Sequence, residues 1–172
     1  MKNQFDLPAF DSAGCLNVVV ESPRGSRIKF VFEPGTNTFL AERMLELGVT
    51  YPFDWGFICG TRADDDDPVD AMVIEDAATY PGTLIKCRPV AMLEVTQTVD
   101  GRKETNPRII VVPAWRDETQ VALPDSQKTQ LEHFFVNAVK STGKKITVRG
   151  WRDADDAVKH IRAHLSPHVD VG

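Results

Sequence analysis

Apolar residues recur at every second position, or in short unbroken runs, over five segments of this 172-residue chain. That pattern is typical of β-strands with one or both faces buried. The segments run from Leu16 to Glu21, Ile28 to Phe32, Leu84 to Val95, Arg108 to Val112, and Lys145 to Arg149. We therefore predict a mainly β protein that contains at least these five strands.

Turn signals separate the apolar segments. They read SPRGS at 22–26, EPGTN at 33–37, YPG at 80–82 and VDGR at 99–102, and Gly, Pro, Asn and Asp at such places favour tight turns. Short strands that do not alternate with helices favour a closed or partly closed antiparallel barrel over a parallel sheet. The expected class is α+β, mainly β, with flanking helices.

A first helix is predicted from about Gln127 to Thr142, with Asp125 or Ser126 as its N-cap and Gly143 as its stop. Apolar residues fall on one face of it at helical spacing. They are Leu131, Phe134, Phe135, Ala138 and Val139. We expect this face to lie against the barrel.

A second helix is predicted from about Ala154 to Leu165, capped by Asp153. Its inward positions are Ala157, Val158, Ile161 and Leu165. His160 and His164 lie one turn apart, which would suit a metal pair. Because the sequence shows no third ligand nearby, we favour a solvated helix face.

Length and composition indicate one domain over residues 1–172 with a core at about 16–165. The chain has no run of 18 apolar residues, and residues 1–11 are too polar for a signal peptide, so we expect no membrane segment and a cytoplasmic location. Three cysteines without CxxC spacing indicate buried thiols. A net charge of −5, without basic and aromatic residues in alternation, argues against nucleic-acid binding.

The segment TRADDDDPVDAM at 61–72 contains four consecutive aspartates, Asp64 to Asp67, and a further aspartate at position 70. Like charges a few ångströms apart repel by about 1 kcal/mol per pair in water, so such a turn is costly without a counter-charge. Hard cations such as Mg²⁺ and Mn²⁺ prefer carboxylate oxygens. The alternatives for this segment are a metal-binding turn and a solvated acidic loop.

Seven motifs, taken together and in order, resemble the soluble family I inorganic pyrophosphatases over Leu16 to Leu165. They are ESPRGSRIKF, AERML, YPFDWGFI, DDDPVDAMV, KCRPVAML, HFF and VRGW. The most specific element is Asp-x-Asp-Pro-apolar-Asp, which residues 65–70 satisfy. The chain is identified as a divergent member of that family.

The resemblance implies a five-stranded OB-like barrel flanked by helices, and an enzyme that hydrolyses a phosphoric anhydride, inorganic pyrophosphate, to two phosphates. It implies Mg²⁺ as the cofactor, with Mn²⁺ or Zn²⁺ as alternatives, and a homo-oligomer, often a hexamer in bacterial members. Water must reach a highly charged phosphorus centre in this reaction, which requires metal charge, an activated water and cationic clamps.

The same resemblance assigns roles to individual residues. Asp67 is the general base and Tyr51 orients the cluster. Lys29, Arg43 and Arg108 bind phosphate oxygens. The metal-binding positions are Asp65, Asp70, Glu21 and Asn106, with Glu21 acting through water.

Several positions depart from the family pattern. Val31 replaces a glutamate, with Glu33 as an alternative carboxylate on the same strand face. Gln97 and Asn106 stand where aspartates are usual, with Asp100 and Glu104 as alternative replacements, and Arg108 stands where the family has a lysine. Trp55 replaces a tyrosine. On the first helix Ala138 and Val139 replace a Tyr-Lys pair, and Lys140, Lys144 or Lys145 are candidates to restore the lost cation.

These departures leave three functions open. The first is a working Mg²⁺-dependent pyrophosphatase with fewer or weaker metal sites and reduced turnover. The second is a phosphohydrolase with an organic leaving group, seated on Ala138 and Val139 beside Trp55. The third is a non-catalytic homologue that keeps the fold for regulation or assembly. The retained cluster of charged residues speaks against the third.

Overall fold

A computed structural model describes residues 3–117 and 122–166 of the chain. The strands of this part are β1 (Leu16–Ser22), β2 (Ile28–Glu33), β3 (Thr38–Met44), β4 (Asp54–Ile58), β5 (Asp70–Val73), β6 (Leu84–Val99), β7 (Arg102–Thr105), β8 (Arg108–Pro113) and β9 (Lys145–Asp153). Its helices are α1 (Asp125–Ala138), a 3₁₀ turn η2 (Lys140–Thr142) and α2 (Ala154–Ala163).

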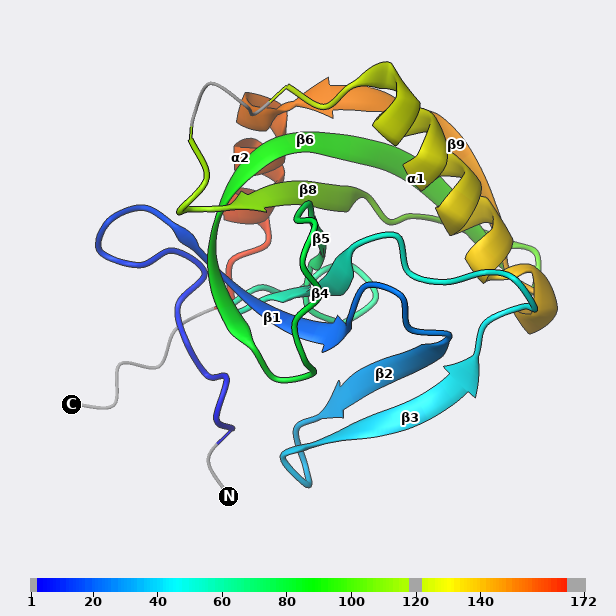
Figure 1. Cartoon of the computed structure of the whole chain (residues 1–172), viewed down its shortest axis with the longest axis horizontal. Helices are drawn as coiled ribbons and strands as arrows, with labels where there is room; N and C mark the ends of the chain where they lie inside the picture. Colours follow the sequence, from blue (N-terminus) through cyan, green and yellow to red (C-terminus); the bar gives the residue numbers. More distant parts are fainter. Residues whose placement is uncertain (1–2, 118–121, 167–172) are drawn as a thin grey trace.

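Five strands close into a barrel in the order β1-β4-β5-β8-β6, and β6 pairs with β1 to complete the ring (Figure 1). The OB-like barrel predicted from the sequence is therefore confirmed. The expectation of antiparallel pairing holds for four of the five joints but is wrong for β5 and β8, which are parallel. Strand β5 reaches β1 through two antiparallel pairings, by way of β4, and β8 does so by way of β6. Both strands therefore run in the direction of β1 and parallel to each other.

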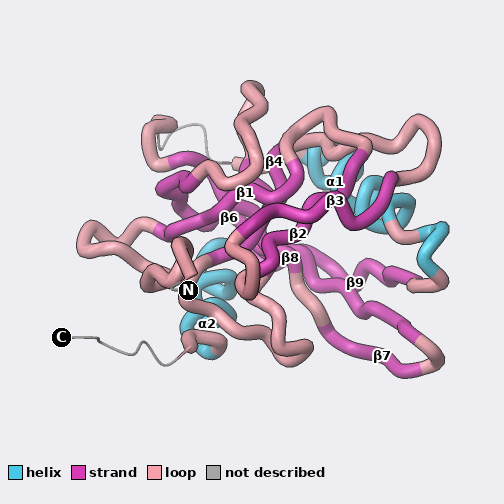
Figure 2. Tube along the Cα trace, turned by 90° about the horizontal axis from the view of Figure 1, so that it is seen from below, coloured by secondary structure: helices cyan, strands magenta, loops and turns pink. Residues whose placement is uncertain are grey.

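Strand β6 is the longest strand of the described residues and continues past the predicted end at Val95 to Val99. It pairs with β1, β8, β9 and β7 in turn, and its register shifts near Pro89 and Glu94 let it curve around the barrel. The predicted turn to β7 is formed by Asp100 and Gly101, both with positive φ. Figure 2 shows the β6–β7 hairpin extending beside β9.

The core divides into three clusters according to which face of the barrel a side chain occupies. Alternate residues of the barrel strands, such as Val18 and Ile109, point inward and pack with Ala157 and Ile161 of α2. A second cluster lies between the outer face of the barrel and α1. The third, built around Phe32 and neighbouring aromatic rings, joins the barrel to the β2–β3 hairpin. The hairpin and α1 therefore cover different parts of the outer surface.

Helix α1 begins and ends earlier than predicted. Its N-cap is Pro124, which provides no side-chain cap, and Asp125 is already its first residue. The predicted capping role of Asp125 or Ser126 is therefore wrong. Gly143 does end the helical segment in the left-handed conformation, after the 3₁₀ turn. Four of the five predicted apolar residues are buried, and Val139 packs against their cluster.

Helix α2 begins where predicted, because the Asp153 side chain accepts a hydrogen bond from the backbone N–H of Asp156. Ala157 and Ile161 are buried as expected. The prediction for Leu165 is wrong: the helix ends at Ala163, and Leu165 is exposed beyond it. No helix within residues 3–117 and 122–166 is long and apolar enough to span a membrane.

Candidate active site

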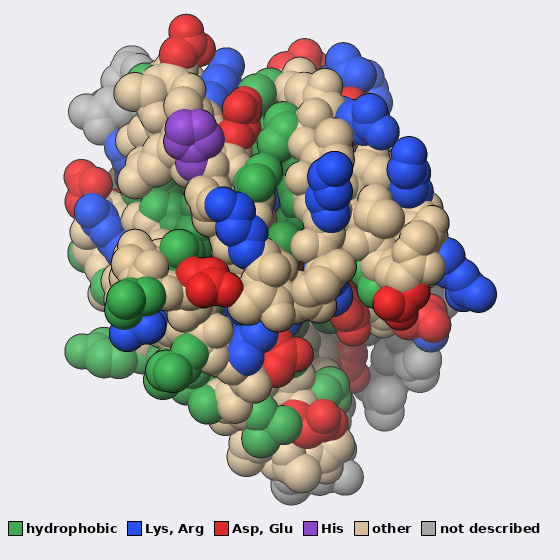
Figure 3. Space-filling model, turned by 90° about the vertical axis from the view of Figure 1, so that its right-hand side faces the viewer, with side chains coloured by type: hydrophobic (Ala, Val, Ile, Leu, Met, Phe, Trp, Pro, Cys, Tyr) green, Lys and Arg blue, Asp and Glu red, His purple; other side chains and the backbone are tan. Residues whose placement is uncertain are grey.

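One cavity of about 570 Å³ contains every site residue predicted from the sequence. It opens between the β2–β3 hairpin, the aspartate turn and α1, and Figure 3 shows acidic side chains set back in a recess low on this side of the molecule. The predicted residues that line it are Glu21, Lys29, Arg43, Tyr51, Asp65, Asp67, Asp70, Asn106 and Arg108. The tertiary structure thus brings together residues that are up to 87 positions apart in sequence.

The two predicted cations on the hairpin are cross-strand partners. Lys29 on β2 lies opposite Arg43 on β3, and a bulge follows, since the next residue of β2, Phe30, pairs with Ala41. Glu42 is the extra residue of this bulge. It lines the same cavity and holds the Lys29 ammonium at 2.6 Å. Sequence reasoning missed Glu42, because strand alternation would place it on the opposite face from Arg43.

Two guanidinium groups carry nitrogens without a partner in the described part of the chain. Arg43 donates through Nη2 to the Ala138 carbonyl at 2.8 Å, while its Nη1 is buried and unpaired. Arg108 has an equally buried and unpaired Nε. A buried donor without an acceptor is costly. Two such donors at one cavity therefore favour the binding of an anion with several oxygen acceptors.

The four consecutive aspartates point in different directions. Asp66 has a positive φ and pairs with Arg62, and Asp64 reaches toward His164. Asp65, Asp66 and Asp67 all line the cavity, and the backbone N–H of Asp67 donates to the Asp65 carboxylate. The turn is closed by hydrogen bonds between the backbones of Ala63 and its neighbours at positions 66 and 67.

Asp70 and Arg108 lie side by side on the floor of the cavity. Asp70 begins β5 and Arg108 begins β8, and the parallel register pairs the residues that follow them. Arg108 donates through Nη1 to the Asp70 carboxylate. Nearby, Asn106 donates to Asp65 at 3.2 Å.

Burial and repulsion between charges raise the pKa values of three carboxyl groups at the cavity. Burial is the main cause of the raised pKa of Asp70, and it outweighs the opposite effect of Arg108. The pKa of Asp67 is raised by burial and by the negative charge of Asp65. Glu21 has a pKa of about 7, because it is buried and lies near Asp70 and Asp67. A divalent cation would offset these costs, so the donor set fits Mg²⁺.

The described residues contain no three His, Cys, Asp or Glu side chains close enough to form a complete metal site as they stand. The carboxylates nevertheless lie close enough to interact electrostatically, since the negative charges of Asp65 and Asp67 both raise the pKa of Asp70. Magnesium usually takes one or two protein carboxylates and completes its shell with water and substrate oxygens. An open arrangement of this kind is therefore compatible with that ion.

Tyr51 is buried at the edge of the cavity, where its ring lies 5.1 Å from that of Phe134. Burial raises the pKa of its hydroxyl to about 12, although the hydrogen bond with Ser22 acts in the opposite direction. The phenol therefore stays protonated at neutral pH. It is suited to orienting neighbouring oxygens through a hydrogen bond.

The proposed replacements for missing carboxylates are not brought into the cavity. Glu33 lies at the end of β2 and accepts a hydrogen bond from Gly35. Asp100 lies in the β6–β7 turn, and Glu104 lines a different cavity. Val31 and Gln97 themselves line the main cavity. The interpretation that Glu33, Asp100 or Glu104 restores the family pattern is therefore not supported by the described residues.

One of the three candidate lysines lies at the cavity. Lys144 lines the cavity, and its charge lowers the pKa of Asp67. Lys140 and Lys145, the other candidates, are not among the residues of the cavity wall. Gly143, in the left-handed conformation, separates the 3₁₀ turn from Lys144. The sequence named all three lysines, and only the folded chain distinguishes them.

The wall on the α1 side of the cavity is apolar. Trp55, Phe135, Ala138 and Val139 contribute to it, and all four belong to or pack against one core cluster. The guanidinium of Arg108 lies 5.5 Å from the centre of the Trp55 ring. Ala138 also supplies the carbonyl that holds Arg43. These residues therefore serve packing and the positioning of charged groups.

Comparison with known proteins gives a consistent result. The family described as "Inorganic pyrophosphatase" matches residues 18–167. A protein of that name from a Synechocystis strain is 39% identical over 155 residues, covering 87% of this chain and 89% of its own. One from Aquifex pyrophilus is 36% identical over 159 residues, with 90% of both chains covered. The crystal structure of inorganic pyrophosphatase from Thermus thermophilus aligns with a TM-score of 0.83 at 30% identity, over 94% of this chain and 96% of that one.

Proposed function

Because this chain belongs to the family I inorganic pyrophosphatases, we propose that it hydrolyses inorganic pyrophosphate to two phosphates in a Mg²⁺-dependent reaction. One observation carries the proposal. Carboxylates, two partly unpaired guanidinium groups and two lysines from separate parts of the chain line a single cavity. Folding alone does not require such a cluster of charge, whereas a metal-bound polyanion would satisfy it.

Asp65 and Asp70 would hold the metal directly, with Glu21 and Asn106 supporting it. When bound, Mg²⁺ would neutralise charge on the phosphates and lower the pKa of a water molecule. The raised pKa values of Asp70 and Glu21 support this assignment, because carboxylates that are costly to ionise alone gain most from a cation. Arg108 now pairs with Asp70 and would share that carboxylate with the ion.

Asp67 would act as the general base. It would accept a proton from the attacking water while the water oxygen bonds to phosphorus. The bridging P–O bond then breaks, and its electron pair leaves with the second phosphate. The pKa of Asp67 is raised by burial and by Asp65, which brings this carboxylate closer to the pH at which a base is most effective.

Cationic side chains would clamp the phosphates. Lys29 and Arg43 are cross-strand neighbours on the hairpin, and Arg108 offers a buried Nε from the barrel. Lys144 would contribute the charge that the residues at 138 and 139 lack, since it lines the cavity near Asp67. Tyr51 would orient the cluster through its protonated hydroxyl.

The test is phosphate release from pyrophosphate by purified protein with MgCl₂. Asp67→Asn should lower the rate by about 10²–10⁴-fold, the usual contribution of a general base. Asp76→Asn is the matched control, because the Asp76 side chain is exposed, pairs with Arg24 and does not line the cavity. Equal rates for the two variants, or no release with Mg²⁺, Mn²⁺ or Zn²⁺, would overturn the proposal.

The substrate itself is tested with a panel of nucleoside di- and triphosphates beside pyrophosphate. Lys144 at the cavity supports pyrophosphate, because a cation suits a charged leaving phosphate better than an organic group. We expect pyrophosphate to give the highest kcat/KM. A nucleotide that exceeds it would establish the alternative function, a phosphohydrolase with an organic leaving group.

The proposal also includes a cytoplasmic location and a homo-oligomer, with a hexamer as the form suggested by family resemblance. Figure 3 shows hydrophobic side chains that reach the surface in groups on this side of the molecule. Strand β3 and the loop after it expose Leu40, Met44 and Leu47, with Leu47 87% exposed. Light scattering at several concentrations would measure the assembly, and a mass equal to one chain throughout would contradict it.

A further inference from the structure

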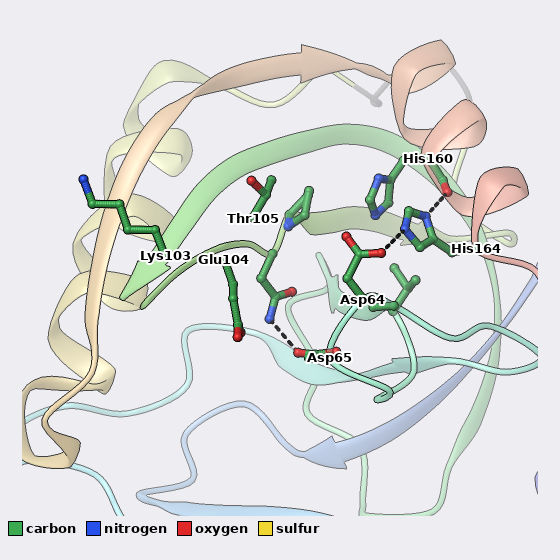
Figure 4. Close-up of a pocket in the computed structure, with 11 residues that line it drawn as sticks. Asp64, Asp65, Lys103, Glu104, Thr105, His160 and His164 are labelled. Atoms are coloured by element: carbon green, nitrogen blue, oxygen red, sulfur yellow. Dashed lines mark hydrogen bonds and ion pairs between the residues drawn. The ribbon is translucent and has the colours of Figure 1, made fainter. Parts of the chain in front are cut away.

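A second cavity, of about 310 Å³, lies on the other side of the aspartate turn, between that turn and α2. Figure 4 shows the rings of His160, on α2, and His164, directly after that helix, side by side, with the Asp64 carboxylate reaching up toward them. Asp65 and Asn106 line both this cavity and the main one. The sequence analysis favoured a solvated helix face for the two histidines. That interpretation is wrong for His164, whose side chain is only 19% exposed.

The hydrogen bond made by Nδ1 of His164 leaves its Nε2, an acceptor in the neutral ring, facing a carboxylate oxygen of Asp64, which is also an acceptor. Its Nδ1 lies 2.8 Å from the His160 carbonyl oxygen, and because a carbonyl only accepts, Nδ1 must carry the hydrogen. In a neutral ring the other nitrogen, Nε2, then presents a lone pair. It lies 3.6 Å from the Asp64 carboxylate oxygen. A cation between these two atoms removes the repulsion, either as a second proton on the ring or as a metal ion.

Backbone contacts join the segment before Asp64 to the end of α2. The N–H of Arg62 donates to the His164 carbonyl at 2.8 Å, and the N–H of Ser166 donates to the Gly60 carbonyl at 2.9 Å. An isolated β-bridge joins Thr61 and Leu165 between them. The start of the aspartate turn is therefore fixed to the end of α2, so the juxtaposition follows from the fold.

His160 supplies a second nitrogen ligand. Its ring centre lies 4.2 Å from that of His164, one turn further along α2. Burial lowers its pKa, and the neighbouring His164 acts in the same direction, so His160 favours the neutral form that binds metals. Two histidines four positions apart on one helix face, each with a free ring nitrogen, suit zinc and similar ions.

We propose that His160, His164 and Asp64 form a binding site for a divalent transition-metal ion of the zinc class, separate from the Mg²⁺ site. Ligand distances of 2.0–2.2 Å around a tetrahedral ion place neighbouring ligand atoms about 3.4 Å apart, close to the 3.6 Å between His164 and Asp64. A metal-bound histidine usually donates its other N–H to a carbonyl or carboxylate, as His164 does here.

The site is not complete as it stands, since no three such groups of the described residues already surround one point. The Asp64 side chain is 86% exposed, so it can turn to complete the shell with little cost. Water would occupy the remaining position. Glu104 and Lys103 also line the cavity, but Figure 4 shows both side chains pointing away from the histidines.

The test measures Zn²⁺ binding directly and does not use pyrophosphate. Equilibrium dialysis in excess Mg²⁺ would count the Zn²⁺ ions per chain for the unaltered protein, His164→Gln and Asp64→Asn. We expect each variant to lose one Zn²⁺ or to bind it more than about 100-fold more weakly, since even supporting residues of a metal site contribute 10–100-fold. Asp155→Asn, an exposed acid on α2 outside the cavity, is the matched control and should bind as the unaltered protein does.

Nuclear magnetic resonance of the imidazole nitrogens provides the second measurement. The Nε2 signal of His164 should move on addition of Zn²⁺ in the unaltered protein. A signal that responds to pH but not to Zn²⁺ would show that a proton takes the place of the metal, and would overturn the proposal. So would equal Zn²⁺ binding by all four proteins. Asp64→Asn changes only an exposed side chain, so it remains informative if His164→Gln fails to fold.

Discussion

Asp70 and Arg108 form an ion pair at the start of two parallel strands, on the floor of the main cavity. Only 7% of the Arg108 side chain is exposed. The pKa of Asp70 is nevertheless raised, because burial outweighs the attraction of the guanidinium. Arg108 alone therefore does not offset the cost of burying the ionised Asp70 carboxylate, and a second cation bound there would stabilise it further. It links the stability of the barrel to the chemistry of the site.

Breaking this pair from one side should be more harmful than removing it. Asp70→Leu leaves the buried Arg108 charge without its partner, and we expect a loss of about 3–5 kcal/mol in the free energy of unfolding. Asp70→Leu with Arg108→Met should recover most of that loss. Urea unfolding in EDTA would measure both, together with Arg108→Met alone. Strictly additive effects would contradict the coupling between the two side chains.

Lys144 should matter for catalysis where its neighbours do not. Lys144→Ala removes a cation from the cavity wall, and kcat/KM for pyrophosphate should fall by about 10²-fold, as for other preorganised electrostatic groups. Lys140→Ala and Lys145→Ala remove the same charge outside the cavity and should retain activity. If the three variants lose activity equally, the general charge of this segment is responsible and the specific role of Lys144 is wrong.

Glu21 should make the metal-free protein less stable as pH rises. Its pKa is about 7 in the folded chain against an ordinary 4.5, so the folded state binds more protons between these values. Stability contributed by the protonated form is therefore lost as pH rises from about 4.5 to 7, by about 3 kcal/mol.

Glu21→Gln should flatten this dependence, because glutamine keeps an acceptor for the Phe32 N–H but does not ionise. Urea unfolding of both proteins in EDTA across this pH range would measure the difference. Added Mg²⁺ should reduce the slope of the unaltered protein. Identical pH profiles for the two proteins in EDTA would show that Glu21 is not the responsible group.

Asn106→Asp should lower the stability of the metal-free protein and raise its affinity for Mg²⁺. Asn106 donates to Asp65 at 3.2 Å, and an aspartate there would lose that bond and face a like charge. We expect the metal-free protein to lose about 1–3 kcal/mol. Mg²⁺ should bind more tightly and raise the unfolding temperature by more than in the unaltered protein.

Asn137→Asp adds the same charge outside the cavity and serves as the control for this experiment. Thermal unfolding with and without Mg²⁺ would compare the three proteins. A Mg²⁺-induced shift no larger in Asn106→Asp than in the control would show that position 106 does not contribute to the metal site.

Local patterns allowed much of the architecture to be predicted. Alternation or unbroken apolar runs identified β1, β2, β6, β8 and β9; β1 and β8 are almost or entirely buried, so they were found as unbroken runs. Strands β4 and β5 were not among the predicted segments: each begins with an aspartate, and only four and three residues of the strand follow it. Strands β3 and β7 were also missed, since most or all of their residues are exposed.

The sequence by itself determined five of the described strands, the turns between them, most of the inner faces of both helices, and the charged residues that the family motif requires. Those features depend on neighbours within a few positions along the chain. The tertiary structure alone decided which aspartate pairs with Arg62 and which lies beside His164, which of three lysines lines the cavity, and that Asp70 pairs with Arg108. Such choices depend on strand register and packing between distant segments, and no local interaction fixes them in advance.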